Sequence, residues 1–207
     1  YIDTYLSASL EIKELNIGGG FGINYLPEDR AKGYEEFFLP VLDKITKYFD
    51  QRGQKPPTIV TEPGRSIVGE AGLTLYRVGS IKKIEGLRTY VSVDGGMADN
   101  IRPALYQARY NGLLVSKAHL PAQEVVTIVG KCCESGDILI KDIPLPQVEK
   151  GDLLAVFSTG AYGYSMASNY NLLPKPGIVW VKEGKDYLVT QAQKVSQIYE
   201  NDFPFPL

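Results

Sequence analysis

The sequence predicts an α/β segment over residues 1–66 followed by an all-β domain over residues 67–207. In the first segment a short strand, a glycine loop, a long amphipathic helix and a second strand follow one another. After residue 66, short apolar runs alternate with Gly and Pro turns, a pattern typical of a β-barrel or β-sandwich. The pattern changes at Glu62-Pro63-Gly64-Arg65, which we place at the join between the two parts.

Composition and charge describe an ordinary globular protein. Hydrophobic residues make up 44% of the chain and charged residues 22%, with a formal net charge of −2. This balance gives no electrostatic reason to expect nucleic acid or a membrane surface as a partner. The longest apolar runs are too short for a transmembrane helix. The chain opens without Met or a signal peptide, in what spacing predicts to be the end of a helix over residues 1–13, so we expect a piece of a longer protein.

The α/β segment reads as a βαβ unit. Residues 15–17 form a predicted strand that enters the glycine loop 18–22, and residues 58–61 form the second strand. Between them, residues 33–51 carry a broad apolar stripe at helical spacing, which we assign to the core. The loops that follow parallel strands lie at one edge of a sheet, where α/β proteins bind ligands. The glycine loop and the Glu-Pro-Gly-Arg loop should therefore be neighbours.

Each of these two loops has two interpretations. Three successive glycines expose backbone N–H groups that can approach a phosphate closely, but the same run also suits a flexible turn. The glycines do not have the spacing of a dinucleotide fingerprint, so a nucleotide-binding module is a weak alternative. The stretch at Glu62 and Arg65 can bind a charged small molecule or form a strand-ending turn with a surface ion pair.

Short strands follow in the second part of the chain. Residues 102–106 suit a loop or a single helical turn, and Pro144 and Pro146 should break the chain. Residues 178–181 and 187–190 predict a hairpin around a turn at 183–186. The other expected strands are 73–84, either whole or as a short helix and a strand, 89–93, 124–129 with a continuation at 138–140, and 153–157.

The two cysteines, Cys132 and Cys133, are adjacent. Neighbouring residues of a strand point to opposite faces, so this pair is poorly placed for a relaxed disulfide and indicates a reducing compartment. One thiol is expected to face a site while the other packs. With His119 as the single histidine and no spaced cysteine pairs, no zinc or other metal site is predicted.

Five segments, taken together and in order, resemble the alanine-racemase-like, fold-type III pyridoxal-phosphate decarboxylases, and within them the branch that acts on diaminopimelate. The segments are residues 18–22, GGGFG; 62–65, EPGR; 102–106, RPALY; 133–137, CESGD; and 160–171, GAYGYSMASNYN. The resemblance implies the last two β/α units of a (β/α)₈ TIM-type barrel followed by the β-domain. It also implies that the lysine that forms the Schiff base and the histidine that stacks on the cofactor lie outside this sequence.

The resemblance implies pyridoxal 5′-phosphate as cofactor and assigns residues to it. Gly18, Gly19 and Gly20 would offer N–H groups to the phosphate, and Glu62 would bond the pyridine nitrogen. Gly64, Arg65 and Tyr162 are the other expected cofactor contacts.

The same resemblance assigns the substrate side. Cys133 is the expected proton donor, and Cys132 is its structural partner. The expected substrate-binding residues are Arg65, Arg102, Tyr106, Glu134 and Tyr162. Without the resemblance, Arg102 would be a surface arginine before a proline and the cysteines a small buried pair in a strand. Tyr76, Tyr164 and Tyr170 are expected to be core or interface aromatics, and His119 a surface or packing residue.

The implied reaction is decarboxylation of meso-2,6-diaminopimelate to L-lysine in cytoplasmic lysine biosynthesis. The family forms homodimers in which the Cys-Glu loop of one subunit completes the site of the other, so the 207-residue chain alone should be inactive. We also expect residues 1–66 to be ordered only beside the rest of a barrel. Two alternatives stay open: a sister decarboxylase for ornithine, arginine or carboxynorspermidine, and a non-catalytic dimerisation or regulatory fragment.

Overall fold

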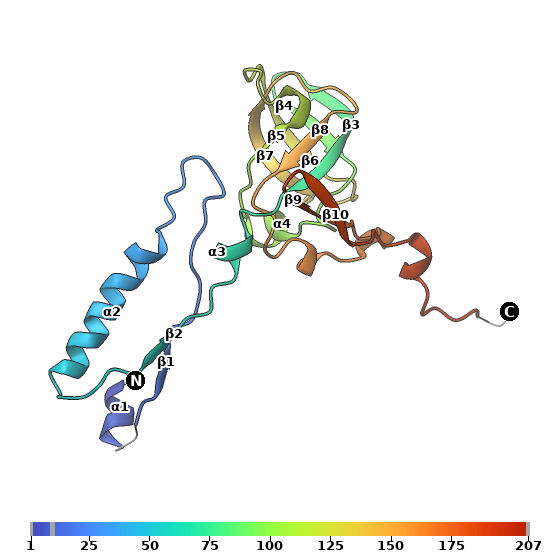
Figure 1. Cartoon of the computed structure of the whole chain (residues 1–207). Coiled ribbons are helices and arrows are strands. Elements are labelled where there is room, and N and C mark those ends of the chain that lie inside the picture. The colour runs from blue at the N-terminus through green and yellow to red at the C-terminus, as the bar shows by residue number, and fades with distance from the viewer. Residues whose placement is uncertain (1, 9–10, 206–207) are drawn as a thin grey trace.

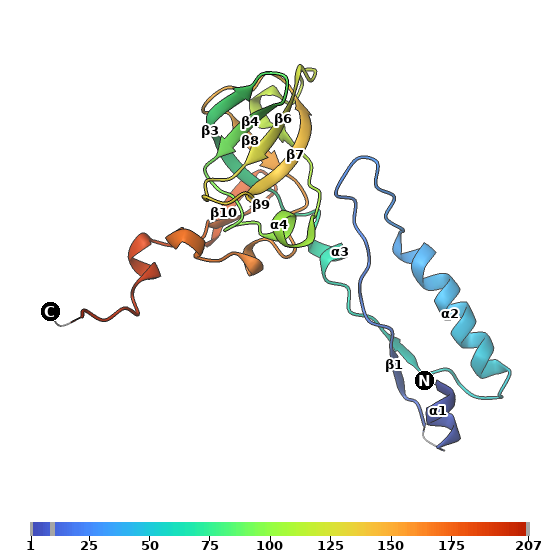
Figure 2. The same cartoon turned by 180° about the vertical axis from the view of Figure 1, so that it is seen from behind.

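The computed structural model describes residues 2–8 and 11–205. An N-terminal arm extends from a compact sheet domain, and the short helix α3 (Arg65–Val68) connects the two, as Figures 1 and 2 show from opposite sides. The sheet domain is followed by a small hairpin and a C-terminal segment.

The N-terminal arm contains the predicted βαβ unit. Strands β1 (Glu14–Asn16) and β2 (Thr58–Val60) pair in parallel, with Asn16 opposite Val60, and helix α2 (Tyr34–Asp50) lies between them in sequence. The expected helix over residues 1–13 is shorter. Helix α1 spans Ile2–Ser7, Leu10 lies outside the described residues, and Lys13 is already extended, with its carbonyl accepting the N–H of Thr58.

The apolar stripe of α2 is not a core, which corrects our assignment. Phe49 is buried, whereas Tyr34 and Phe37 are about two-fifths exposed, at 43% and 40%. The packing partner of the helix N-terminal half is the buried ring of Phe21, whose centroid lies 4.8 Å from that of Phe37. A two-stranded sheet is too small to cover a helix of this length, and α2 stands away from the sheet domain in both views (Figures 1 and 2).

The second part is dominated by one sheet with strand order β5-β8-β3-β4-β6-β7. Its strands curl around one core and give a nearly barrel-like sheet (Figure 1), which confirms the mostly-β architecture. Strand β3 makes the corner: its first half pairs with β8, its second half with β4, and the register shifts between Val78 and Ile81. The strands are β3 (Thr74–Ile84), β4 (Arg88–Val93), β5 (Gly112–Leu114), β6 (Glu124–Val129), β7 (Ile138–Leu145) and β8 (Leu153–Val156).

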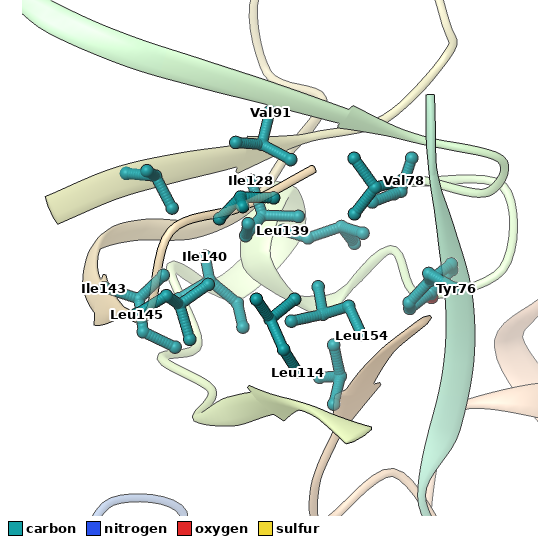
Figure 3. Packing of buried hydrophobic residues seen from close by; sticks show 14 of the residues in the cluster. Tyr76, Val78, Val91, Leu114, Ile128, Leu139, Ile140, Ile143, Leu145 and Leu154 are labelled. Carbon is teal, nitrogen blue, oxygen red and sulfur yellow. The ribbon is translucent and has the colours of Figure 1, made fainter. Parts of the chain in front are cut away.

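Alternating side chains of these strands fill the core (Figure 3). Val91, Val126, Ile128 and Leu154 have no exposed surface, and Tyr76 joins the same cluster, as expected for a core aromatic. Burying an aliphatic side chain contributes about 1.5–3 kcal/mol, so this cluster is the main source of stability in the domain. It forms the rigid support from which the surrounding loops project.

Two expectations for the sheet were wrong. Residues 138–140 do not continue the strand at 124–129, because β7 turns back and pairs antiparallel with β6. Pro144 does not break the chain and lies inside β7, opposite Val125. An edge strand tolerates proline because one of its sides needs no ladder hydrogen bond. Strand β5 was not predicted, since three residues carry too little pattern.

The hairpin expected near residue 183 is present as β9 (Ile178–Lys182) and β10 (Lys185–Thr190). Glu183 and Gly184 both have positive φ, 53° and 73°, as a type I′ hairpin turn requires. Short helical segments complete the described chain: α4 (Arg102–Tyr106), η1 (Val115–Lys117), η2 (Tyr164–Met166), η3 (Tyr170–Leu172) and η4 (Val195–Ile198). Within the described residues, none of the helices is long and apolar enough to cross a lipid bilayer.

Candidate active site

The two loops that follow β1 and β2 are joined by Asn16. Its side-chain oxygen accepts the N–H of Gly18 at 2.7 Å, and its amide nitrogen donates to Glu62 Oε1 at 2.8 Å. The N–H of Glu62 in turn donates to the carbonyl of Gly18 at 2.9 Å. The expectation that these loops are neighbours is confirmed. Glu62 is bonded to Asn16 and not to Arg65, so the alternative of a Glu62–Arg65 surface ion pair is wrong.

Glycine is required in the first loop for two different reasons. Gly18 and Gly20 have φ of 78° and 83°, a backbone conformation that other residues adopt only with strain. At Gly19 a Cβ atom would collide with the carbonyl oxygen of Glu62. The N–H of Gly18 is taken by Asn16, whereas those of Gly19 and Gly20 have no partner within the described residues. Two N–H donors therefore remain for an anion at this loop.

Four predicted site residues line one cavity of about 310 Å³: Arg65, Arg102, Tyr106 and Tyr162, together with Met166. Arg65 comes from α3, Arg102 and Tyr106 from α4, and Tyr162 from the segment after β8. Figures 1 and 2 show α3 and α4 close together at the base of the sheet domain. The fold thus gathers residues that are far apart in the sequence into one concave site.

The segment that carries Tyr162 is fixed onto the chain around α3. The N–H groups of Thr159 and Gly160 donate to the carbonyls of Gly72 and Gly69, both at 3.0 Å. A Cβ at Gly160 would collide with the carbonyl of Val68, so only glycine permits this approach. These contacts explain why Tyr162, itself in a left-handed conformation with φ of 59°, reaches the cavity beside Arg65.

Arg102 is buried, with 8% of its surface exposed, so it is not a surface arginine before a proline. Its guanidinium carbon lies 5.7 Å from the ring centroids of Tyr25 and Tyr106 and 5.5 Å from that of Tyr162. No carboxylate in residues 2–8 or 11–205 forms an ion pair with Arg102 or Arg65. The Nε atoms of both arginines are buried without a hydrogen-bond partner in this part of the chain. Aromatic rings stabilise a guanidinium without neutralising it, and its donors remain for an anion.

Cys133 and Glu134 form a second group that does not line this cavity. Cys133 is exposed as a free thiol, and the hydroxyl of Tyr170 donates to Glu134 Oε1. Cys132 is half-buried, and burial raises the pKa of its thiol, an effect that nearby Asp137 increases. Tyr170 is 41% exposed, so it is not a core aromatic. It contacts Glu134, which is one of the predicted site residues. Tyr164 and His119 are exposed as well.

Asp137 holds the turn that presents Cys133, a role that we did not predict. Its buried carboxylate accepts the N–H of Met97 at 2.7 Å and that of Cys132 at 2.8 Å. A Cβ at Gly96 or Gly130 would collide with this carboxylate. Met97 lies on the chain that leads into α4. One carboxylate thus joins the loop carrying Cys133 to the loop that leads to Arg102.

Comparison with known proteins places these residues in a family. Residues 6–160 match the family model "Pyridoxal-dependent decarboxylase, C-terminal sheet domain". A diaminopimelate decarboxylase of Bacillus subtilis is 50% identical over 199 residues, which cover 96% of this chain and 45% of that protein. One of Staphylococcus aureus is 50% identical over 194 residues, with coverages of 93% and 46%. The chain therefore spans less than half the length of these curated relatives.

Solved structures agree with the sequence relatives. The diaminopimelate decarboxylase of M. jannaschii in complex with L-lysine superposes with a TM-score of 0.90 at 33% identity, over 98% of this chain and 46% of that one. The Helicobacter pylori enzyme in complex with L-lysine gives a TM-score of 0.84 at 29% identity, with coverages of 97% and 47%. Almost all of this chain thus adopts an arrangement found within those longer proteins.

Proposed function

The chain belongs to the pyridoxal-dependent decarboxylases, and on this premise we propose that it serves an enzyme that converts meso-2,6-diaminopimelate to L-lysine and CO₂. The observation that carries the proposal is the cavity in which Arg65 and Arg102 meet with unpartnered Nε atoms. Diaminopimelate carries a carboxylate at each end. A planar guanidinium can bond both oxygens of a carboxylate, and two of them suit a ligand with more than one anionic group.

The residues at the carboxyl ends of β1 and β2 fit pyridoxal 5′-phosphate. The free N–H groups of Gly19 and Gly20 suit its phosphate, and Arg65, Gly64 and Tyr162 are the further contacts that we assign to it, with Gly18 completing the loop. Glu62 is an acceptor for the protonated pyridine nitrogen, and Asn16 fixes its carboxylate. When bound, this cofactor withdraws electrons from the carbon that loses CO₂.

The chain's own residues would bind the substrate and supply a proton. Arg102 and Tyr106 hold a substrate carboxylate at the cavity. Glu134 accepts from the distal ammonium, and Tyr170 keeps that carboxylate in place. The thiol of Cys133 gives its proton to the carbon that has lost CO₂. A thiol that has given up its proton can take another from water, which returns the site to its starting state.

We also propose a homodimer with shared sites. In support, Cys133 and Glu134 lie outside the lining of the cavity formed by Arg65 and Arg102 in the same chain. A loop from a second copy could supply the thiol that the cavity lacks. In this arrangement residues 1–66 are the last two β/α units of a (β/α)₈ barrel and residues 67–207 are the β-domain. Free adjacent thiols favour a cytoplasmic location.

Arg102→Ala in the full-length protein tests the proposed function. It should lower kcat/KM for meso-diaminopimelate about 100-fold, or ~2.7 kcal/mol, because a desolvated charge pair with the substrate is lost. Arg77→Ala is a matched control, because Arg77 is an exposed arginine on β3 that bonds the carbonyl of Gly151. If both variants retain wild-type kcat/KM, the cavity is not the substrate site.

A further inference from the structure

Tyr25 lies in a loop that crosses from the N-terminal arm to the sheet domain and belongs to none of the five family segments. On one side of it, the N–H of Asn24 donates to Glu70 Oε1 at 2.8 Å, and the carbonyl of Asn24 accepts from Ser158 at 3.3 Å. Ser158 is buried and lies two residues after the end of β8. The loop is therefore attached to the segment after α3 and to the segment after β8 immediately before Tyr25.

The conformation of Tyr25 is fixed locally and through its ring. Asp29 Oδ2 accepts the N–H groups of Tyr25 and Leu26 at 2.8 and 2.9 Å, which closes a tight turn. The ring packs edge-on against Tyr110, with centroids 5.2 Å apart and planes at 83°. Tyr110 is 3% exposed and belongs to the sheet-domain core. An aromatic residue from the arm is thus held against a residue that cannot move easily.

The ring of Tyr25 contacts the guanidinium of Arg102 from outside the cavity lining. The guanidinium carbon lies 5.7 Å from its ring centroid, yet Tyr25 does not line the cavity, whereas Tyr106 and Tyr162 do. The hydroxyls of Tyr25 and Tyr110, like Nε of Arg102, are buried with no hydrogen-bond partner in the described ranges. Burial raises the pKa of Tyr110, and the nearby Arg102 guanidinium opposes that rise. The guanidinium thus has Tyr110 as a polar neighbour, and Tyr25 is the ring that contacts it from outside the cavity lining.

We propose that Tyr25 is a positioning residue that holds the Arg102 guanidinium at the cavity and thereby sets affinity for a ligand carboxylate. The inference rests on the proposed function, because it assumes that Arg102 binds the substrate. Arg102 has a long flexible side chain, and each freely rotating bond lowers its affinity for a ligand through lost entropy. The ring of Tyr25 removes part of that freedom before the ligand arrives. It also places this restraint three residues after Gly22, at the end of the glycine loop.

The test compares two ligands in the full-length protein with bound cofactor. L-lysine carries a carboxylate, whereas cadaverine has the same diamine chain without one. Tyr25→Ala should weaken L-lysine about tenfold by isothermal titration calorimetry, while cadaverine changes by less than about twofold. Tyr25→Phe keeps the ring and should bind L-lysine like the wild type. Tyr187→Ala, on the exposed hairpin, is the control for loss of a tyrosine.

Three results would overturn the inference. Tyr25→Ala could leave L-lysine affinity unchanged, it could weaken both ligands equally, or Tyr25→Phe could lose as much as Tyr25→Ala. Arg102→Ala separates this inference from the function on which it rests. If Arg102→Ala loses L-lysine affinity and Tyr25→Ala does not, the positioning role alone is wrong. If Arg102→Ala also binds L-lysine normally, the proposed carboxylate site is wrong and the positioning role falls with it.

Discussion

Arg102 carries a charge that its surroundings stabilise without neutralising. Taking a charge out of water costs several kcal/mol, and a cation–π contact returns only about 0.5–2 kcal/mol. Three such contacts surround Arg102, from Tyr25, Tyr106 and Tyr162. A protein that needed only stability would place a carboxylate here. The arrangement suits a site at which Arg102 pairs with the anionic group of a ligand that binds and dissociates.

Glu62 offers a test at the level of one carboxylate. Because Asn16 fixes Glu62 and the glycine loop retains its own donors, Glu62→Ala should impair chemistry more than cofactor binding. We predict that kcat falls about 100-fold, or ~2.7 kcal/mol, while cofactor affinity, followed by absorbance, changes much less. Glu85→Ala, which removes an exposed carboxylate from the turn between β3 and β4, is the control. Parallel loss of cofactor and activity would contradict this role for Glu62.

Asp152 predicts how stability depends on pH. Burial would raise the pKa of its carboxyl, but the ammonium of Lys117 at 2.8 Å and the N–H of Glu149 outweigh burial and lower it. A carboxyl with a lowered pKa stabilises the fold above its unfolded pKa, about 3.9, and loses this contribution as pH falls through the folded value. Asp152→Asn should therefore lower the melting temperature at neutral pH and have a smaller effect at about pH 3.

Thermal melts at the two pH values check this prediction for Asp152. Glu149→Gln is the matched control, because Glu149 also bonds Lys117 but its side chain is 68% exposed, so its effect should be small at both pH values. An equal drop in melting temperature for Asp152→Asn under both conditions would show that the carboxylate charge is not the cause.

Asp137 provides a test at the level of elements, because it joins the loop before α4 to the turn with Cys133. Asp137→Ala leaves the half-buried N–H groups of Met97 and Cys132 without an acceptor, which should destabilise the sheet domain by about 2–4 kcal/mol. It should also change the rate at which iodoacetamide alkylates Cys133, measured by mass spectrometry at a temperature where the fold persists. Asp186→Ala in the exposed hairpin is the control. A normal alkylation rate with reduced stability would limit Asp137 to a structural role.

The elements that the sequence predicted are those with a repeating pattern. The βαβ unit, the hairpin of β9 and β10 and most of the central strands have apolar periodicities bounded by Gly or Pro. Strand β5 was missed because three residues carry no periodicity. The stripe of α2 was identified as amphipathic but assigned to a core that the described arm does not supply. Periodicity identifies the apolar face of a helix, but it does not identify the element that packs against that face.

The site was predictable where residues belong to contiguous segments and not where they act through space. Arg65, Arg102, Tyr106 and Tyr162 were expected to serve one function, and the cavity brings them together. The surroundings of Arg102 could not be foreseen, because one of the rings that contact it, Tyr25, comes from a distant loop. Asn16 is a common polar residue with no spacing signature. Asp137 belongs to the segment 133–137, but its hydrogen bond to Met97 reaches a distant loop that the sequence does not reveal. The sequence offered one sign of a role for Asn16, which is a polar residue near the end of a predicted strand and shortly before the glycine loop.

At the scale of the whole molecule, apolar side chains remain exposed on α2 and on the hairpin of β9 and β10, among them Phe37, Leu42, Trp180 and Leu188. Exposed apolar side chains gathered on these elements are available to pack against another protein surface. The expectation that residues 1–66 are ordered only beside the rest of a barrel stays a prediction. Proteolysis of the isolated 207-residue chain should cleave this segment before the sheet domain, and resistance of the arm would contradict it.

A mixing experiment tests whether two copies share a site. Glu62→Ala and Cys133→Ala homodimers of the full-length protein should each have low activity. After the two variants exchange subunits, half of the dimers are mixed and each holds one intact site, so activity should rise to about one quarter of wild type. Mixing two separately prepared Cys133→Ala samples is the control. Activity that stays at the mean of the parents would show that each subunit builds its own site.

The most direct measurement of the central claim is the release of CO₂ by the full-length protein from a panel of amino acids. With pyridoxal phosphate supplied, meso-diaminopimelate should be decarboxylated, and ornithine, arginine and carboxynorspermidine should release little CO₂. This preference follows from a cavity that places two unpaired guanidinium groups at the ligand. Faster release from any of the other three substrates, or no release from meso-diaminopimelate, would contradict the account.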